Sequence, residues 1–166
     1  MSGTKDDWSI GNLSQSTFAK TLFRLYTKSP TEDENALIRG DKLAHYAGYP
    51  LRKYFINKED NVILSIVWKS FYEIASMWPE QWSDENESSI LKKTTGYISF
   101  IEVLRIWLNS NPKIIEEDQT IKDSFIRIKE KYESEEYIFT REHYPSGHQG
   151  VVILRDQLLL DLNIIS

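Results

Sequence analysis

The strongest helical pattern in the chain lies in residues 57–78, whose sequence is NKEDNVILSIVWKSFYEIASMW. With about 3.6 residues per turn, one side of a helix over this segment carries five apolar residues: Ile63, Ile66, Val67, Ile74 and Trp78. Four others widen the apolar stripe past half of the circumference: Leu64, Trp68, Phe71 and Tyr72. A helix that is apolar on nearly all sides is buried by several neighbours. We therefore predict that residues 57–78 form the central helix of the fold, which Pro79 ends.

Shorter segments with helical spacing lie on both sides of this central helix. We predict one helix from Ser14 or Ser16 to about Thr27, because Ser29-Pro30 stops it, and one or two short helices within residues 41–57. Three further predicted helices span about 95–109, 118–134 and 150–162.

Two stretches between these helices have other patterns. Residues 30–40 are acidic and turn-prone, and residues 136–140 are the one place for a short extended segment. Strand-like alternation is scarce elsewhere. The sequence therefore predicts an all-α, mostly helical fold: a five- to six-helix orthogonal bundle around the central apolar helix.

Length and composition are those of a single globular domain. The chain has 166 residues, of which 40% are hydrophobic and 27% charged. Residues 1–13 are a polar tail with the anchors Trp8 and Leu13, so we expect a single helical domain over residues 14–166. The N-terminus has no apolar secretory region and no apolar run is long enough to cross a bilayer, which predicts a cytoplasmic protein without a membrane partner.

Charge and cysteine content exclude several classes of function. Twenty Lys and Arg against twenty-five Asp and Glu give a net charge of −5, whereas proteins that bind the phosphate backbone usually have a basic excess. Duplex binding by the whole surface is therefore disfavoured, and a local basic patch stays open. Because the chain has no cysteine, disulfides, thiolate zinc sites and cysteine nucleophiles are excluded.

No catalytic or metal-binding motif is present in the sequence. His143 and His148 lack the spacing of a helical metal pair, so we expect surface loop histidines there, and a hydrogen-bonded helix histidine at His45. The carboxylates gather in hydrophilic runs, which are usually solvated faces: 31–41, 80–87 and 116–136. We therefore expect no catalytic residue, no metal and no cofactor.

Two predicted helix starts could instead bind an anion or a nucleic-acid phosphate. The first is Lys92, Lys93, Thr94, Thr95 and Gly96, where hydroxyls and backbone amides follow two lysines. The simpler interpretation is an ordinary N-cap by Thr94 or Thr95, with Gly96 allowing a close helix contact, and we favour it two to one.

The second helix start follows Tyr144-Pro-Ser-Gly-His-Gln-Gly150. Here Ser146, Gly147 and Gly150 suit exposed backbone amides, and Arg141 and Arg155 could flank them. The simpler interpretation is a tight connection that positions the last helix, and we favour it because connections between helices are usually short. Both sites could act together if the fold brings them close.

The aromatic residues and the C-terminal run are candidates for core or docking. We expect Trp68, Trp78 and Trp107 in the core, whereas Trp8 or Trp82 could be an exposed docking residue. The apolar run 158–165 either completes the core or forms an interface with another chain or a missing domain.

Four short motifs, in this order, resemble one protein family. They are Leu13-Ser-Gln-Ser-Thr, Trp78-Pro-x-x-Trp82, Leu91-Lys-Lys-Thr-Thr-Gly96, and Pro145-Ser-Gly-His-Gln-Gly150 with Leu154. Over most of residues 8–162 the chain resembles the C-terminal helical half of DGQHR-domain proteins, the DndB-like group associated with DNA sulfur modification. The resemblance implies a link to bacterial DNA-modification and phage-defence loci.

The chain departs from that family in one large respect. The D-G-Q-H-R signature and the β-containing lobe that carries it are absent, and Gly147-His-Gln-Gly150 is not that motif. The chain would then be a detached half, a fragment or a short relative. Only the helical scaffold and the two helix starts, 94–96 and 146–150, are carried over from the family.

These observations leave three hypotheses. The leading one is a non-enzymatic accessory or regulatory module of a bacterial DNA-modification or phage-defence system, which binds DNA, another protein subunit or a missing N-terminal lobe. The alternative is a small acidic helical protein-interaction or inhibitor protein, a phage-borne one included, whose acidic surface occupies a basic groove. The third is an anion-dependent enzyme, which requires a deep pocket joining the helix starts to a buried carboxylate and His143.

Overall fold

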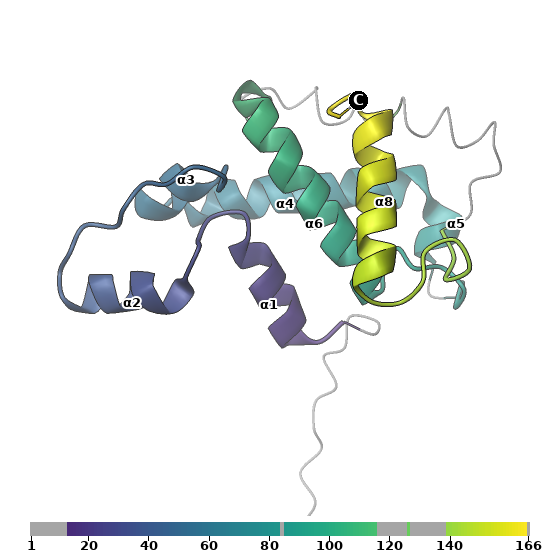
Figure 1. The fold of residues 1–166 in the computed structure, drawn as a ribbon, viewed down its shortest axis with the longest axis horizontal. Coiled ribbons are helices and arrows are strands. Elements are labelled where there is room, and N and C mark those ends of the chain that lie inside the picture. The colour runs from purple at the N-terminus through teal and green to yellow at the C-terminus, as the bar shows by residue number, and fades with distance from the viewer. Residues whose placement is uncertain (1–12, 84, 116–125, 127–138, 166) are drawn as a thin grey trace, which may run out of the picture.

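The structure, a computed structural model, describes residues 13–83, 85–115, 126 and 139–165. Its elements are α1 (Gln15–Phe23), α2 (Pro30–Ile38), α3 (Arg52–Ile56), α4 (Asp60–Met77), α5 (Pro79–Trp82), α6 (Thr94–Ser110), the 3₁₀ helix η1 (Pro112–Ile115) and α8 (His148–Asp161) (Figure 1). An isolated antiparallel bridge joins Ser89 to Thr140, and the described ranges contain no β-strand. The predicted all-α fold is confirmed. Apart from residue 126, the helix predicted at 118–134 lies outside the described residues, as does the tail anchor Trp8.

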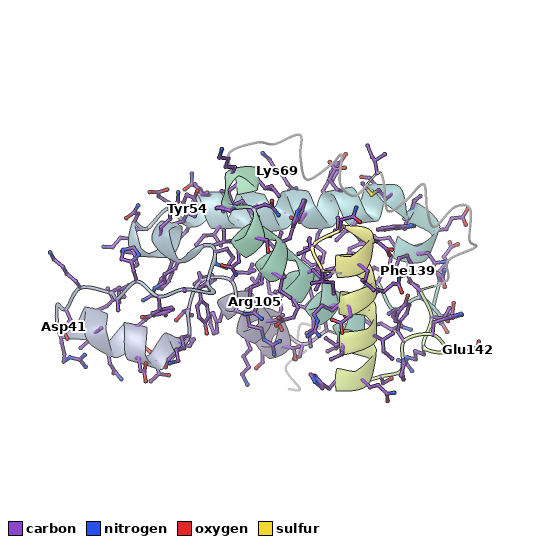
Figure 2. The ribbon with its side chains drawn as sticks, turned by 45° about the horizontal axis from the view of Figure 1, so that its top comes forward. Asp41, Tyr54, Lys69, Arg105, Phe139 and Glu142 are labelled. Carbon is purple, nitrogen blue, oxygen red and sulfur yellow. The ribbon has the colours of Figure 1, made fainter. Side chains whose placement is uncertain are left out.

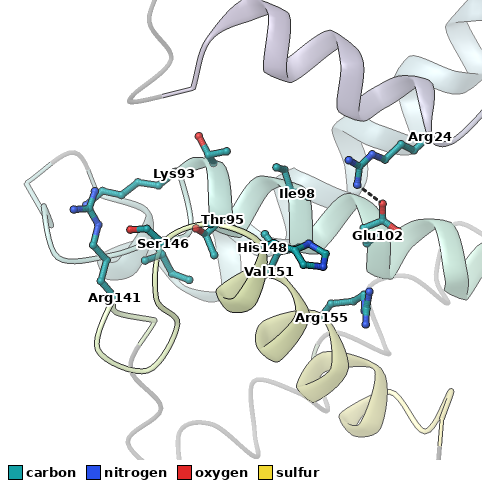
Figure 3. A pocket seen from close by; sticks show the side chains of 13 residues that line it. Arg24, Lys93, Thr95, Ile98, Glu102, Arg141, Ser146, His148, Val151 and Arg155 are labelled. Carbon is teal, nitrogen blue, oxygen red and sulfur yellow. Dashed lines mark hydrogen bonds and ion pairs between the residues drawn. The ribbon is translucent and has the colours of Figure 1, made fainter. Parts of the chain in front are cut away.

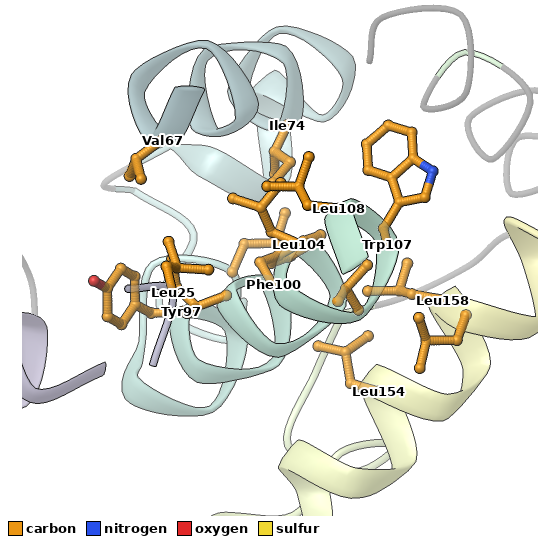
Figure 4. Close-up of a cluster of buried hydrophobic side chains, with 14 of the residues drawn as sticks. Leu25, Val67, Ile74, Tyr97, Phe100, Leu104, Trp107, Leu108, Leu154 and Leu158 are labelled. Carbon is orange, nitrogen blue, oxygen red and sulfur yellow. The ribbon is translucent and has the colours of Figure 1, made fainter. Parts of the chain in front are cut away.

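Helix α6, rather than the segment 57–78, is the most deeply buried helix among the described elements. Eleven of its seventeen residues are buried. The contact between α6 and α8 is more extensive than that between any other described pair of elements. Figure 4 shows Tyr97, Phe100 and Leu104 of α6 among side chains from α4 and α8 and beside Leu25, which follows α1. The predicted bounds of this helix, about 95–109, agree with the structure to within one residue.

Helix α4 buries only one of its faces. Ile66 and Ile74 are buried as predicted, but Leu64, Trp68 and Tyr72 are 67%, 69% and 61% exposed. The prediction that this helix is covered on nearly all sides, with Trp68 in the core, is therefore wrong. Hydrophobicity alone does not distinguish a face that the core covers from an apolar face left at the surface.

The other predicted core residues lie where expected. Trp78 and Trp107 are buried. Trp82 is half-buried beside Phe71, with ring centroids 6.3 Å apart, so it is not a fully exposed docking residue. In the C-terminal run, Leu158 and Leu159 complete the core, whereas Leu160 remains 46% exposed.

Helix α2 occupies residues that the sequence predicts as turns. Ser29 accepts a hydrogen bond from the backbone amide of Glu32, and Pro30 stands at the first helical position. A Ser-Pro pair therefore starts this helix, because proline fits the first turn, where its missing N–H costs nothing. The preceding helix α1 is capped by Ser14, one of the two predicted caps, and ends at Phe23 rather than Thr27.

The segment between α2 and α4 contains a single short helix, α3. Residues 41–46 are irregular, and His45 is exposed there, so the prediction of a helix histidine is wrong. Gly48 has a φ of +85°, a conformation that favours glycine and interrupts helical structure. In Figure 2, Asp41 after α2 and Glu142 before α8 lie toward opposite ends of the molecule.

A buried ion pair joins α2 to α3. Arg52 donates to both carboxylate oxygens of Asp33, at 2.5 and 2.8 Å, and to the carbonyl oxygens of Ala44 and Tyr26. Its guanidinium also lies 4.3 Å from the ring centroid of Tyr46. Because Asp33 is the one buried residue of α2, this pair fixes the position of the helix.

Among the helices in the described ranges, none is both long enough and apolar enough to cross a lipid bilayer.

Candidate functional site

Helices α6 and α8 bring the two predicted helix starts to the same end of the molecule. They run alongside each other in the same direction (Figure 1), and the hydroxyl of Ser99 donates to the carbonyl oxygen of Val151 at 3.2 Å. The loops that precede Thr94 and His148 therefore lie close together, although 54 positions separate these two residues.

Two of the predicted glycines allow the loop before each helix to pack closely against the first turn of that same helix. A Cβ atom at Gly96 would overlap the carbonyl oxygen of Ile90, and one at Gly150 would overlap the carbonyl oxygen of Pro145. Both glycines are buried, so the expectation of an exposed backbone at Gly150 is not met, whereas the close contact expected at Gly96 is present. Gly147 has a φ of +88° and begins α8 as its N-cap.

A pocket of about 500 Å³ lies between these two helix starts (Figure 3). Seven of the residues singled out from the sequence line it: Lys93, Thr94, Thr95, Arg141, Ser146, Gly147 and Arg155. Lys92, Gly96 and Gly150 do not belong to the lining. The N-cap of α6 is Lys93 without a side-chain hydrogen bond, so neither Thr94 nor Thr95 caps the helix as expected.

The basic residues of this pocket differ in their partners. Lys93 donates to the carbonyl oxygen of Glu87, and Arg155 pairs with the partly exposed carboxylate of Asp156 at 2.7 Å. Arg141 is exposed and forms no ion pair with any residue in the described ranges. Figure 3 shows Lys93 and Arg141 at one end of the pocket and Arg155 toward the other.

Glu102 supplies a buried carboxylate that sequence reasoning did not select. It accepts hydrogen bonds from Arg24, the C-cap of α1, at 2.6 Å, and from Nε and Nη2 of Arg105, at 3.1 and 2.9 Å. Burial by itself raises the pKa of Glu102, but the hydrogen bond from Arg24 and the charge of Arg105 outweigh it and hold the pKa below its ordinary value. Glu102 therefore stays ionised, with its oxygens engaged by two arginines.

A second pocket, of about 550 Å³, adjoins the first. Both pockets include Arg24 and Glu102 in their lining. The second is further lined by Lys20, Lys28, Arg105, Phe23, Thr27, Pro30, Thr31 and Tyr49. We call the two pockets together the basic tract, after its seven basic residues: Lys20, Arg24, Lys28, Lys93, Arg105, Arg141 and Arg155.

The basic tract is suited to binding anions at two neighbouring positions. Among its described lining residues, Glu102 is the one carboxylate against seven basic side chains. Guanidinium groups bind phosphate and carboxylate oxygens through paired N–H donors, and a concave site reduces the screening of these charges by water. The tract thus concentrates positive charge in a chain whose net charge is −5.

The same residues offer little for acid–base catalysis. His148 lines the first pocket, whereas His143, which the enzyme hypothesis requires, does not. A general base needs an available lone pair, and Arg24 and Arg105 occupy the oxygens of Glu102. Within the described residues, no group of three or more His, Asp or Glu side chains could hold a metal ion.

Sequence reasoning found the two helix starts but not Arg24, Glu102 or the second pocket. A signal for the pair Glu102 and Arg105 does exist, since they interrupt the apolar run 97–108 at a spacing of three residues. Arg24 directly follows α1, 78 positions before Glu102, and no local pattern predicts that contact.

Comparisons of the chain with protein-family models, with curated proteins and with solved structures find no match. The resemblance to DGQHR-domain proteins therefore stays a hypothesis.

Proposed function

We propose that this chain is a non-enzymatic accessory or regulatory module that binds nucleic acid, DNA in the first instance, through the basic tract. The observation that carries the proposal is that seven basic side chains line two adjoining pockets that share the Arg24–Glu102 ion pair. These are seven of the twenty Lys and Arg residues in an acidic chain.

The physical basis is the release of counterions from the phosphate backbone. Each phosphate that a Lys or Arg neutralises releases condensed cations, which makes the affinity fall as the salt concentration rises. The acidic remainder of the surface repels DNA, so the tract would set the position of the bound strand.

The biological setting of the proposal comes from the resemblance. DndB-like proteins are linked to bacterial DNA-modification and phage-defence systems, so we place the module in such a system, in the cytoplasm. The basic tract includes part of each helix start that the resemblance carries over: Thr94 and Thr95 of the first, and Ser146, Gly147 and His148 of the second.

The proposal is tested by measuring the binding of fluorescein-labelled DNA by anisotropy at about 50 and about 200 mM salt. If about four phosphates are contacted, the affinity falls roughly 100-fold between these two concentrations. Lys93→Ala and Arg141→Ala should each weaken binding and reduce the salt slope by about one. Lys113→Ala is the matched control, because Lys113 is exposed in η1 and does not line either pocket. Absence of binding at the lower salt concentration would refute the proposal.

A second candidate function is protein binding, which the exposed face of α4 favours. Leu64, Trp68 and Tyr72 follow one another at four-residue spacing and are each more than 60% exposed. Exposed aromatic residues in such a row are typical of protein interfaces. A pull-down with a basic partner tests this alternative: Trp68→Ala or neutralisation of the 31–41 and 80–87 acidic runs should reduce capture.

A further inference from the structure

The second pocket combines positive charge with two aromatic side chains. Phe23 and Tyr49 line it together with Lys20, Arg24, Lys28 and Arg105. Both rings are half-buried, so each keeps part of its surface open. The first pocket has no aromatic ring except the imidazole of His148 among its described lining residues. The two halves of the basic tract therefore differ in what they can bind besides phosphate.

The Tyr49 ring is held in place by its neighbours. It packs edge-to-face on Tyr46, with ring centroids 5.0 Å apart and an angle of 80° between the rings. Tyr46 is fixed in turn, because its hydroxyl accepts a hydrogen bond from the backbone amide of Lys28 at 2.9 Å and Arg52 lies over its ring. An edge-to-face contact covers at most one face of a ring, so it does not prevent a planar group from stacking on Tyr49.

The dimensions of the tract favour an unpaired strand over a duplex. Pockets of about 500 and 550 Å³ are of the size that holds a small organic ligand, such as one nucleotide, and a duplex is too wide to enter them. In a duplex the faces of the bases are also stacked on one another, whereas an unpaired base offers its face to an aromatic side chain. Grooves that combine basic residues with aromatic rings are typical of single-strand binding.

We infer that the nucleic acid bound in the basic tract is single-stranded, with its backbone passing Arg24 between the two pockets and one unpaired base stacked on Tyr49. This inference rests on the proposed function and narrows it to one class of ligand. Tyr49 supplies stacking, which every base accepts, so the site would show little sequence preference.

The test compares a labelled oligo-dT of about 12 nucleotides with a duplex of the same length at one salt concentration, by anisotropy. The single strand should bind at least about 10-fold more tightly. Tyr49→Ala should reduce single-strand affinity about 10-fold and leave the salt slope unchanged, because no phosphate contact is lost. Tyr49→Phe should retain affinity, since it keeps the aromatic face. Tyr72→Ala, an exposed tyrosine of α4 outside both pockets, is the matched control.

If the alanine variant does not fold, Tyr49→Leu replaces it, because leucine keeps apolar volume without an aromatic face. The single-strand affinity of Tyr49→Leu should also fall about 10-fold. Equal affinity for duplex and single strand, or unchanged single-strand affinity in the variant that folds, would overturn this inference and leave the proposed function standing. Failure of the wild-type protein to bind either DNA would overturn both.

Discussion

Arg24, the C-cap of α1, donates to a carboxylate oxygen of Glu102 of α6 at 2.6 Å, and this ion pair is common to both pockets of the basic tract. The Arg24 side chain is 49% exposed, whereas that of Glu102 is 9% exposed. Since Arg105 also binds Glu102, one carboxylate orients two guanidinium groups and leaves the cluster with an excess positive charge. The ion pair thus joins the C-terminal end of α1 to α6, and Glu102 positions the side chains of Arg24 and Arg105 in the tract.

Replacing Glu102 with glutamine should destabilise the fold moderately. The change removes the buried charge that pairs with Arg24 and Arg105, but both arginines are partly solvated, at 49% and 33% exposure. We therefore expect the free energy of unfolding to fall by about 1–2 kcal/mol, less than for a fully buried pair. Urea unfolding measures this change. Glu142→Gln, at an exposed loop position, is the control and should change stability by less than about 0.5 kcal/mol.

The ion pair between Asp33 and Arg52 should matter more for stability. The two side chains are 11% and 3% exposed, so Asp33→Asn leaves a buried guanidinium without its counter-ion. The expected loss is about 3–5 kcal/mol, the usual cost of removing one partner of a buried pair. Asp41→Asn is a matched control, because Asp41 pairs with Arg39 at the surface, where both are more than half exposed. The free energy of unfolding of the control should fall by no more than about 0.5 kcal/mol. Equal decreases in the two variants would contradict the role assigned to the buried pair.

Acid should weaken the fold through the same two carboxylates. The hydrogen bond from Arg52 holds the pKa of Asp33 below its ordinary value of 3.8, against the opposing effect of burial. The pKa of Glu102 likewise lies below its ordinary value of 4.5, because Arg24 and Arg105 outweigh burial. A carboxyl with a lowered pKa in the folded state contributes stability that is complete above its unfolded pKa. That contribution disappears as the pH falls through the folded pKa.

The contribution of these two groups to the urea midpoint of unfolding should therefore change little between about pH 7 and pH 5. Below about pH 4 the midpoint should decrease. Asp33→Asn should show a shallower fall, since one of the two groups no longer titrates. A fall of equal steepness in wild type and variant would show that Asp33 does not contribute to the acid dependence.

The sequence predicts helix bounds well where local signals are strong. Asn111-Pro112 marks the end of α6, and Ser14 caps α1 as expected. The sequence does not predict which helix is central, because α4 and α6 are both apolar and only tertiary packing decides which faces are covered. Helix α2 is missed for a different reason: its residues are acidic, and the Ser29-Pro30 pair can end one helix as well as start another.

Part of the candidate site can likewise be predicted from the sequence. Lys93 and Arg141 can be singled out, because helix starts beside basic residues are local patterns. Their convergence depends on α6 and α8 running in the same direction, which no local pattern specifies. Tyr49 and Arg24 line the tract only because segments distant in the sequence pack together, so a motif search does not identify them.

Gly150 connects the packing of α8 to the shape of the first pocket. A Cβ atom at this position would overlap the backbone carbonyl oxygen of Pro145, which cannot move aside as a flexible side chain could. Gly150→Ala should therefore shift the loop 145–149 that holds Ser146, Gly147 and His148 at the pocket. We expect it to lower stability by about 3 kcal/mol or more and to weaken DNA binding even at temperatures where the variant is folded.

Gly40→Ala separates this packing effect from backbone strain alone. Gly40 has a φ of +76° with no atom within 4 Å of an added Cβ, so its replacement introduces strain without a steric overlap. That variant should lose only about 1–2 kcal/mol and should bind DNA as the wild type does, because Gly40 lines neither pocket. Thermal unfolding and the anisotropy assay measure both quantities. If Gly150→Ala behaved like Gly40→Ala in both assays, the close contact at Pro145 would not be what shapes the pocket.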